Sequence, residues 1–301
     1  MNSYKRIDTF AEYNDKMKDF INHVKLLVGE KGKPCPINCI IVSGEKGVGK
    51  SYQVKKTLDE LKGIRPSYIY PGEISPVELY RTMWQHNDAV IVLDDVNSII
   101  MDKNQGASLL KAACEDKVTR RLFWKKRNPD CIHVDQDNPS DNEEVAIKMK
   151  RRVDATGSKK LKDKHTNGET FPDTFFFTGA IIILTNKPLS VIDKATEGAL
   201  GNRSWHQEML FSVPGAVDLI KNIGPLIIGK DSSNPEQDPL TEESVNAAVK
   251  FLTTDKYIKF YEKHEHIPSF RTLKRVAREF QYKMTDITDD TILNNTEPRV
   301  Y

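Results

Sequence analysis

The sequence predicts an α/β protein with a parallel β-sheet at its centre and a smaller helical domain at its C-terminal end. Short apolar, β-branched runs alternate with helical patterns over the first two thirds of the chain. Strands of that kind are typical of a parallel sheet that is covered on both faces. From about residue 214 onward helical patterns replace the strands. We therefore place an N-terminal helical segment at 1–35, an α/β domain at 36–213 and a helical domain at 214–301.

The elements follow from periodicity and from breaking residues. Apolar residues at helical spacing predict a helix within 9–28, with Asp8 or Thr9 at its start. The predicted strands are 39–44, 67–70, 89–93 and 180–184, and the predicted helices between them start near Lys50 and cover 76–85 and 105–116. In the C-terminal part the predicted helices are 214–223, 241–252 and 270–283, with a polar loop at 231–239.

The composition excludes several classes of protein. The formal net charge is +2, so a nucleic-acid surface would have to be local. No apolar run approaches the roughly 20 residues of a membrane helix. The N-terminal residues MNSYKRIDTF lack an apolar signal core, which predicts a cytoplasmic protein without membrane association. The spacing of the four cysteines fits neither a zinc ribbon nor a disulfide framework.

The strongest motif is GEKGVGKS at residues 44–51, which satisfies G-x-x-x-x-G-K-[ST] directly after a strand and before a helix. In this P-loop context the glycines let backbone N–H groups surround phosphates, Lys50 reaches the β- and γ-phosphates, and Ser51 ligates Mg²⁺. The cofactors predicted on this basis are ATP and Mg²⁺. The predicted nucleotide-binding residues are Gly44, Glu45, Lys46, Gly47, Val48, Gly49, Lys50, Ser51 and Tyr52.

Polar residues end two of the later strands. Asp94 follows four apolar residues, where an acid can hold Mg²⁺ through water, and Asp95 can orient and deprotonate the attacking water. The strand AIIIL ends in Thr185 and Asn186, and Asn186 can position that water near the γ-phosphate. A weaker interpretation of the two aspartates is a pair that caps the next turn.

GEKGVGKS, VIVLDD and IIILTN resemble the Walker A, Walker B and sensor 1 elements of the AAA+ ATPase superfamily. GALGNRS (198–204) is similar to the segment that carries the arginine finger, with Arg203 matching, and PSFRTLKRVAREF (268–280) is similar to the sensor 2 helix, with Arg271 matching. The resemblance covers about residues 36–283. It departs from the pattern at Asp95, where many members have Glu.

The resemblance implies a P-loop NTPase core of the AAA+ type with a C-terminal helical lid domain and Mg-dependent ATP hydrolysis. It also implies a homo-oligomeric ring, most often a hexamer, because an arginine finger is supplied by a neighbouring subunit. Lys50, Asp95, Asn186, Arg203 and Arg271 are the catalytic residues that it implies, and Ser51 and Asp94 the Mg²⁺ ligands.

About 60 residues separate the helix ending near Asp116 from the strand at 180–184, and this insert (119–178) resembles a hairpin that precedes sensor 1 in one AAA+ branch. The flanks TRRLFWKK and ETFPDTFFF predict a long β-hairpin with a mobile distal part. Phe123, Trp124, Lys125, Lys126 and Arg127 form one candidate DNA-contacting group, and the basic run 148–164 another. Packing of the aromatic residues in the hairpin core, and pairing of the basic run with the acidic run 135–144, are the competing interpretations.

These observations favour a ring-forming AAA+ ATPase that moves or remodels DNA, as a helicase, helicase loader or replication factor. One alternative is a MoxR-like protein-remodelling ATPase, because LLKAACEDKVTRR (109–121) looks like the helix and turn before the hairpin in that group. Another is a monomeric P-loop kinase that phosphorylates a small molecule.

Overall fold

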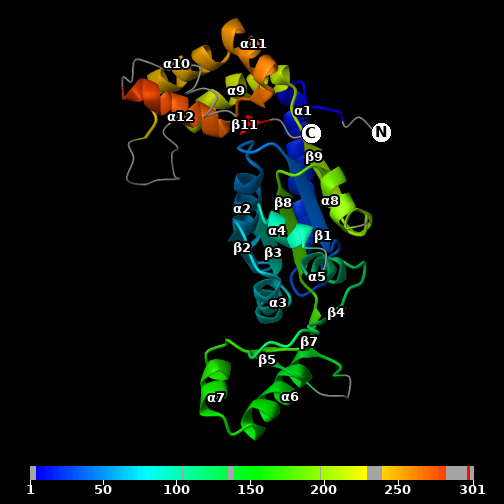
Figure 1. Ribbon diagram of the computed structural model, residues 1–301. Coiled ribbons are helices and arrows are strands. Elements are labelled where there is room, and N and C mark those ends of the chain that lie inside the picture. The colour runs from blue at the N-terminus through cyan, green and yellow to red at the C-terminus, as the bar shows by residue number, and fades with distance from the viewer. Residues whose placement is uncertain are drawn as a thin grey trace.

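Five parallel strands form the central sheet, in the order β2-β3-β8-β1-β9 (Figure 1). The computed structural model describes residues 5–102, 105–134, 139–196, 198–228, 239–282 and 297–298. The strands of the sheet are β1 Cys39–Gly44, β2 Ser67–Pro71, β3 Val90–Asp94, β8 Ala180–Thr185 and β9 Trp205–Met209. The predicted α/β fold with a parallel sheet is therefore confirmed, and four of its five strands coincide with predicted ones.

The register of the sheet brings the ends of three strands together. In β1 and β8, Ser43 lies opposite Thr185, and in β3 and β8, Asp94 lies opposite Leu184. Gly44, which ends β1, is therefore at the same edge as Asp94 and Thr185. Carboxyl ends of parallel strands are where ligands bind in α/β sheets, so this edge is where the candidate site is expected.

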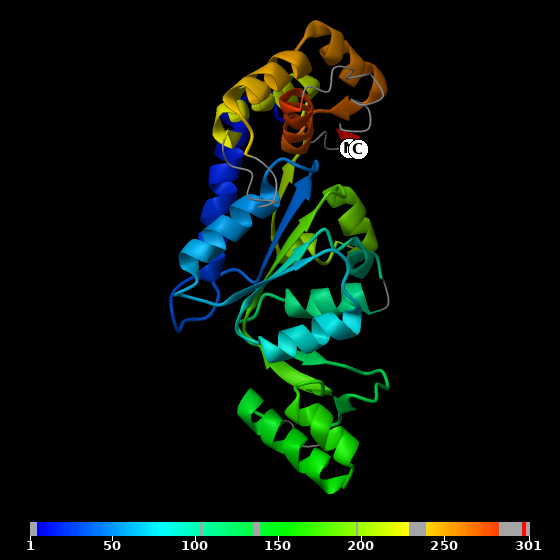
Figure 2. The same ribbon diagram turned by 90° about the vertical axis from the view of Figure 1, so that its left-hand side faces the viewer.

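Helices cover both faces of the sheet (Figure 2). Ile40 and Val42 of β1 belong to a core that includes residues of α1 Phe10–Val28, α2 Lys50–Leu61 and the C-terminal helices. Cys39 and Ile41 point into a second core. The helices of that second face are α3 Pro76–Gln85, α4 Asn97–Met101, α5 Gly106–Ala113 and α8 Leu189–Thr196. The strands are apolar throughout because alternate residues face different cores.

Four helices form the C-terminal part of the chain. They are α9 Val213–Ile227, α10 Glu242–Leu252, α11 Asp255–His264 and α12 Phe270–Gln281, and a two-residue strand β10 His266–Ile267 pairs with β11 Glu297–Pro298. The helices predicted at 214–223, 241–252 and 270–283 are confirmed, and α11 was not predicted. Nearly all of the predicted loop 231–239 lies outside the described residues. None of the helices in the described residues is both long and apolar enough to cross a lipid bilayer.

The insert lies at the end of the molecule opposite the C-terminal helices (Figure 1). Its two flanks pair antiparallel as predicted, as β4 Arg120–Phe123 and β7 Thr174–Phe177. The predicted long hairpin with a mobile distal part is wrong, because 139–166 folds mainly into helices. Beyond β4 and β7 the chain forms β5 Cys131–Ile132, α6 Asn142–Ala155, α7 Lys159–Thr166 and β6 Phe171–Pro172.

Helical periodicity explains α6. Asp141 caps its first turn by accepting the backbone N–H of Glu144, and Val145, Met149 and Val153 form a buried stripe at a spacing of four. The basic run 148–164 therefore lies on α6, on α7 and on the turn between them. Residues 135–138 of the acidic run lie outside the described residues.

A buried arginine joins the insert to the sheet. Arg120 is 1% exposed. Its guanidinium donates hydrogen bonds to Asn38 Oδ1, just before β1, at 2.9 Å and to the Gly179 carbonyl, just before β8. Further bonds reach the carbonyls of Ala113 (3.0 Å) and Lys117 (3.0 Å). These acceptors are uncharged oxygens, and the guanidinium also lies over the Phe177 ring of β7, 5.0 Å from its centroid. Arg120 therefore holds the insert against the amino ends of β1 and β8 through hydrogen bonds and a cation–π contact.

Candidate nucleotide-binding site

The loop between β1 and α2 has the backbone conformation of a phosphate cradle. Gly44, Gly47 and Gly49 have φ angles of 140°, 69° and 93°, a region that favours glycine. A β-carbon on Gly44 would lie 2.2 Å from the Met209 carbonyl oxygen, so no other residue fits there. Gly49 precedes α2 and gives no side-chain cap. The first N–H groups of α2 are therefore available to an anion.

Lys50 is held inside this loop. Its ammonium donates to the carbonyl oxygens of Gly44 at 2.9 Å and Glu45 at 2.7 Å. Burial lowers the pKa of Lys50 to about 8. The side chain thus places a cation next to the backbone N–H groups that could bind phosphates.

Ser51 and Asp94 come from α2 and from the end of β3 and meet in front of the loop. The Ser51 hydroxyl donates to Asp94 Oδ1 over 2.9 Å. A hydroxyl and a carboxylate this close form a pair of hard oxygen donors, which suits Mg²⁺ with its preference for oxygen ligands and retained water. The two residues therefore fit the predicted metal.

Asp95 lies beside these donors in an unusual backbone conformation. Its φ is 61°, which is uncommon for residues other than glycine, although Asp and Asn are enriched there. Its backbone N–H donates to the Leu184 carbonyl over 2.8 Å, which locks the turn after β3 against β8. The second carboxylate therefore leaves the sheet in a direction different from that of Asp94.

Asn97 connects the polar residues of β3 and β8. Its side-chain nitrogen donates to Asp95 Oδ1 at 3.0 Å and lies 3.4 Å from Asn186 Oδ1. Its side-chain oxygen accepts from the Thr185 hydroxyl at 2.8 Å. Sequence reasoning missed this residue; its only signal was a polar side chain two positions after Asp95, at the start of α4.

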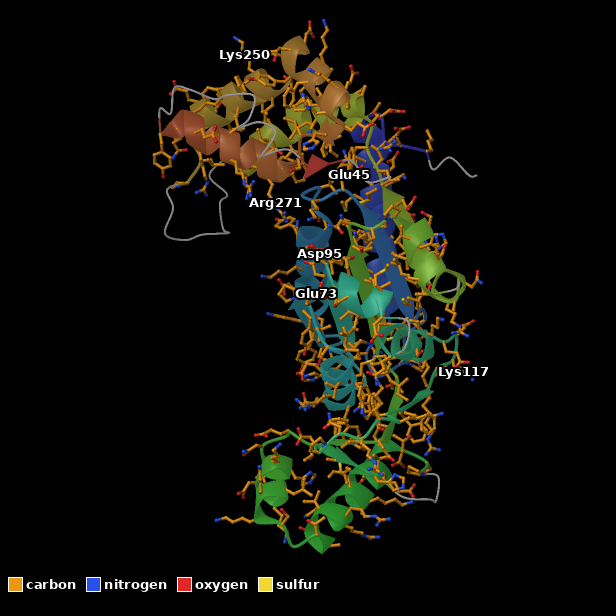
Figure 3. All side chains as sticks on the ribbon, viewed as in Figure 1. Glu45, Glu73, Asp95, Lys117, Lys250 and Arg271 are labelled. Carbon is orange, nitrogen blue, oxygen red and sulfur yellow. The ribbon has the colours of Figure 1, made fainter. Side chains whose placement is uncertain are left out.

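One cavity of about 550 Å³ brings most of the predicted residues together. Its lining consists of residues 46–52, Pro71, Gly72, Asp94, Asp95, 184–186, Phe270, Arg271 and Lys274. In Figure 3, Arg271 lies where α12 comes closest to the sheet, with Asp95 below it. The Phe270 backbone N–H also donates to the Gly47 carbonyl over 3.1 Å, so the C-terminal helices contact the loop directly.

Two predicted residues lie beneath the cavity. Gly44 ends β1, and Glu45 is fully buried with its Oε2 accepting the Phe211 backbone N–H at 3.1 Å. Arg6 lies 3.7 Å from Glu45 Oε1. Burial raises the pKa of Glu45 to about 7. Glu45 therefore supports the loop from behind, facing the N-terminal segment rather than the cavity.

Arg203 is the predicted catalytic residue that does not line the cavity. It ends the short helix η1 Gly201–Arg203, and its Nη1 donates to the Lys111 carbonyl at 3.2 Å. The side chain is exposed and absent from the cavity lining. Arg271, in contrast, lines the cavity of its own chain.

No known family model matches the chain. A segment is 33% identical over 94 residues to an uncharacterized 36.7 kDa protein of the nrdC-mobD intergenic region of Enterobacteria phage T4. That match covers 29% of this chain and spans only 28% of the phage protein.

Among solved structures, the Thermotoga maritima RuvB Holliday junction branch migration motor is 12% identical, with a TM-score of 0.39 over 96% of this chain and 71% of that chain. A point mutant of the same RuvB gives 12% and a TM-score of 0.43, with 96% and 71% covered. A DNA replication initiation factor is 11% identical with a TM-score of 0.33, covering 94% of this chain and 71% of that chain.

Proposed function

We propose that the protein is an AAA+ ATPase that forms a homo-oligomeric, hexameric ring and couples ATP hydrolysis to the movement or remodelling of DNA, as a helicase, helicase loader or replication factor. The observation that carries the proposal is the convergence of the P-loop, Ser51 with Asp94, and Asp95 with Asn97 and Asn186 on one cavity. These residue types, at these positions, are those that phosphoryl transfer to water requires.

Each side chain has a separate task in this proposal. Lys50 and the N–H groups of α2 bind the phosphates, and Ser51 and Asp94 hold Mg²⁺. Mg²⁺ held by these two residues would offset the charge of the phosphates. Asp95 accepts a proton from the attacking water, while Asn186 orients that water. Arg271 adds a cation from the C-terminal helices to the same cavity.

The proposal that the subunits form a ring depends on Arg203. Its side chain is exposed and lies outside the cavity of its own chain, as an arginine finger acting on a neighbouring subunit must. A cation supplied in trans stabilises the charge that develops on the γ-phosphate only after assembly. Hydrolysis would then be coupled to ring formation.

The proposal of a DNA substrate depends on the insert, which carries exposed cations at 125–127 as well as on α6 and α7. A protein-remodelling role is less favoured, because the apolar face of α1, the segment available as a partner-binding element, is buried in the core. Tyr13, Met17 and Phe20 are each no more than 5% exposed.

The test is the ATPase rate at low salt with and without single-stranded and double-stranded DNA, combined with electron microscopy in the presence of an ATP analogue. We expect rings, and a rate stimulated by DNA in a salt-dependent manner. A strict monomer that phosphorylates a small molecule would overturn the proposal in favour of a kinase. Rings that capture a single protein client and ignore DNA would favour the MoxR-like alternative.

A further inference from the structure

A second cavity, of about 520 Å³, opens at the base of the insert. The lining residues that matter here are Trp124, Lys125, Lys126, Arg127, His133 and Asp173. These residues lie in the loops that follow β4 and β5 and that precede β7. These strands are at the end of the molecule opposite the C-terminal helices (Figure 1). The volume falls in the range of small-ligand sites and is large enough for part of a nucleotide.

The cavity is cationic. Lys125, Lys126 and Arg127 are exposed and consecutive, and within the part of the chain that the structure describes none of them forms an ion pair. The Asp173 carboxylate is already engaged: Oδ1 accepts the Val134 backbone N–H at 2.9 Å, and Oδ2 contacts His133 Nδ1. Three cations thus face one occupied carboxylate, which favours an anionic ligand.

Trp124, which lines this cavity, carries a buried donor without an acceptor. Trp124 Nε1 is inaccessible to solvent and has no hydrogen-bond partner among the described residues. The ring is held in place by Tyr80 (centroids 5.4 Å apart) and Phe171 (6.2 Å), and the Trp124 backbone N–H donates to the Asp173 carbonyl at 2.7 Å. Leaving such a donor unsatisfied costs about 1–3 kcal/mol, a cost that an oxygen of a ligand would remove once the groups covering the N–H move aside to admit it.

We infer that this cavity is a contact site for single-stranded DNA and holds part of one nucleotide of the strand. Lys125, Lys126 and Arg127 would pair with its phosphates, and the Trp124 indole N–H would donate to an oxygen of the same nucleotide. A concave site with a recessed donor fits an unstacked strand, whereas a duplex presents a rigid cylinder. The inference rests on the proposed function, because it names the surface that would contact the DNA.

The basic run on α6 and α7 is the less suitable surface, since several of its cations are already paired. Lys164 contacts Asp130 at 2.5 Å, Lys148 contacts Glu144 at 2.9 Å, and Lys162 lies 4.0 Å from Asp154. Competing carboxylates weaken the attraction of these side chains for phosphate. The loop 125–127 has no such competition within the described residues.

The test compares two triple variants with equal loss of charge. Lys125→Gln, Lys126→Gln and Arg127→Gln alters the cavity, and Lys150→Gln, Lys159→Gln and Lys160→Gln alters exposed residues of α6 and α7. Binding of a labelled oligo-dT is measured by fluorescence anisotropy at several salt concentrations. We expect the cavity variant to lose at least about tenfold in affinity and its log–log salt slope to fall by about 2, with a loss under about threefold for the control.

Equal losses in the two variants would overturn the inference, since charge alone would then explain binding. The ATPase rate measured without DNA should stay unchanged in the variant of residues 125–127, because these residues lie outside the cavity that contains the P-loop. Wild-type protein that shows no salt-dependent DNA binding would refute the DNA part of the proposed function itself. The two failures are therefore distinguishable.

A single substitution tests the indole donor. Trp124→Phe keeps an aromatic ring between Tyr80 and Phe171 and removes only the N–H donor and part of the ring surface. We expect a loss of about three- to tenfold in affinity with the salt slope unchanged, and a loss of most of the DNA-induced quenching of tryptophan fluorescence. Unchanged affinity together with unchanged quenching would show that Trp124 is only a packing residue.

Discussion

Asn97 donates a hydrogen bond from its side-chain nitrogen to Oδ1 of Asp95 over 3.0 Å. The side-chain oxygen of the same amide accepts a hydrogen bond from the Thr185 hydroxyl at 2.8 Å. One side chain therefore sets the direction of Asp95, which follows β3, relative to the polar end of β8. Because it contacts the residue that would take up the proton, Asn97 is a positioning residue in the proposed reaction.

We expect Asn97→Ala to lower the hydrolysis rate by about tenfold or more while leaving ATP affinity within about twofold, since the carboxylate would lose its fixed orientation. Steady-state ATPase assays and binding of a fluorescent ATP analogue measure the two effects. Ser98→Ala is the matched control, because Ser98 bonds Glu73 instead. An equal effect of both substitutions would point to a general loosening of α4.

Lys50→Ala is expected to reduce ATP affinity by about a hundredfold or more, because it removes the buried cation that faces the phosphates. Lys46→Ala removes an exposed lysine from the rim of the same cavity and should cost only a few-fold. Isothermal titration with a non-hydrolysable analogue compares them. Similar losses for both lysines would show that the cavity attracts nucleotide through its overall field rather than through Lys50.

Asp95→Asn should keep ATP binding while hydrolysis falls by about a hundredfold or more, because the amide cannot accept the proton. The substitution suits the fold, since Asn tolerates the φ of 61° found there. Single-turnover hydrolysis and equilibrium binding are the measurements. A normal hydrolysis rate would mean that Asp95 is not the base.

Arg203→Ala should lower hydrolysis and leave the ATP affinity of the isolated subunit nearly unchanged, whereas Arg271→Ala should weaken that affinity directly, because Arg271 lines the cavity of its own chain. Mixing Arg203→Ala with Asp95→Asn subunits gives a sharper test. An Arg203→Ala subunit next to an Asp95→Asn neighbour would regain a complete site, so the mixture should be more active than either variant alone. Failure to complement would argue that Arg203 does not act in trans.

Glu45 should make stability depend on pH. Its pKa is raised to about 7 in the folded protein by burial, so the folded state binds the proton more tightly than the unfolded state. Stability contributed by the protonated form is then lost as pH rises from the unfolded pKa of 4.5 through 7, by on the order of 3 kcal/mol. Glu45→Gln should therefore raise the melting temperature at pH 8 and change it little at pH 5.

Thermal melts without nucleotide at the two pH values check this prediction, and Glu45→Gln keeps an oxygen that can accept the Phe211 N–H. A gain in melting temperature that is the same at both pH values would contradict the assignment of the effect to ionisation.

The sequence predicted the three central strands well, because β1, β3 and β8 are apolar on both faces and their polar ends are distinctive. It missed β9, since WHQEM is an edge strand with polar residues and no apolar run. The insert was interpreted from its many charged residues, and the four-residue spacing of Val145, Met149 and Val153, which predicts α6, was overlooked.

The residues that sequence reasoning could not place are those whose role depends on tertiary contacts. Arg120 looks like part of a basic stretch in the sequence, yet it is the largest fully buried side chain among the described residues. Asn97 has no motif of its own and gains its role only because the turn after β3 meets the end of β8. Both needed the three-dimensional arrangement to be recognised.

Arg120 has a mechanical consequence. It ties the first strand of the insert to the chain just before β8, while Asn186 follows the other end of that six-residue strand, roughly 20 Å away. A joint held by several hydrogen bonds resists bending, so a small rotation of β8 at the cavity would tilt the whole insert. Arg120 would then be the fulcrum of a lever arm, and the far tips of α6 and α7 would move the most.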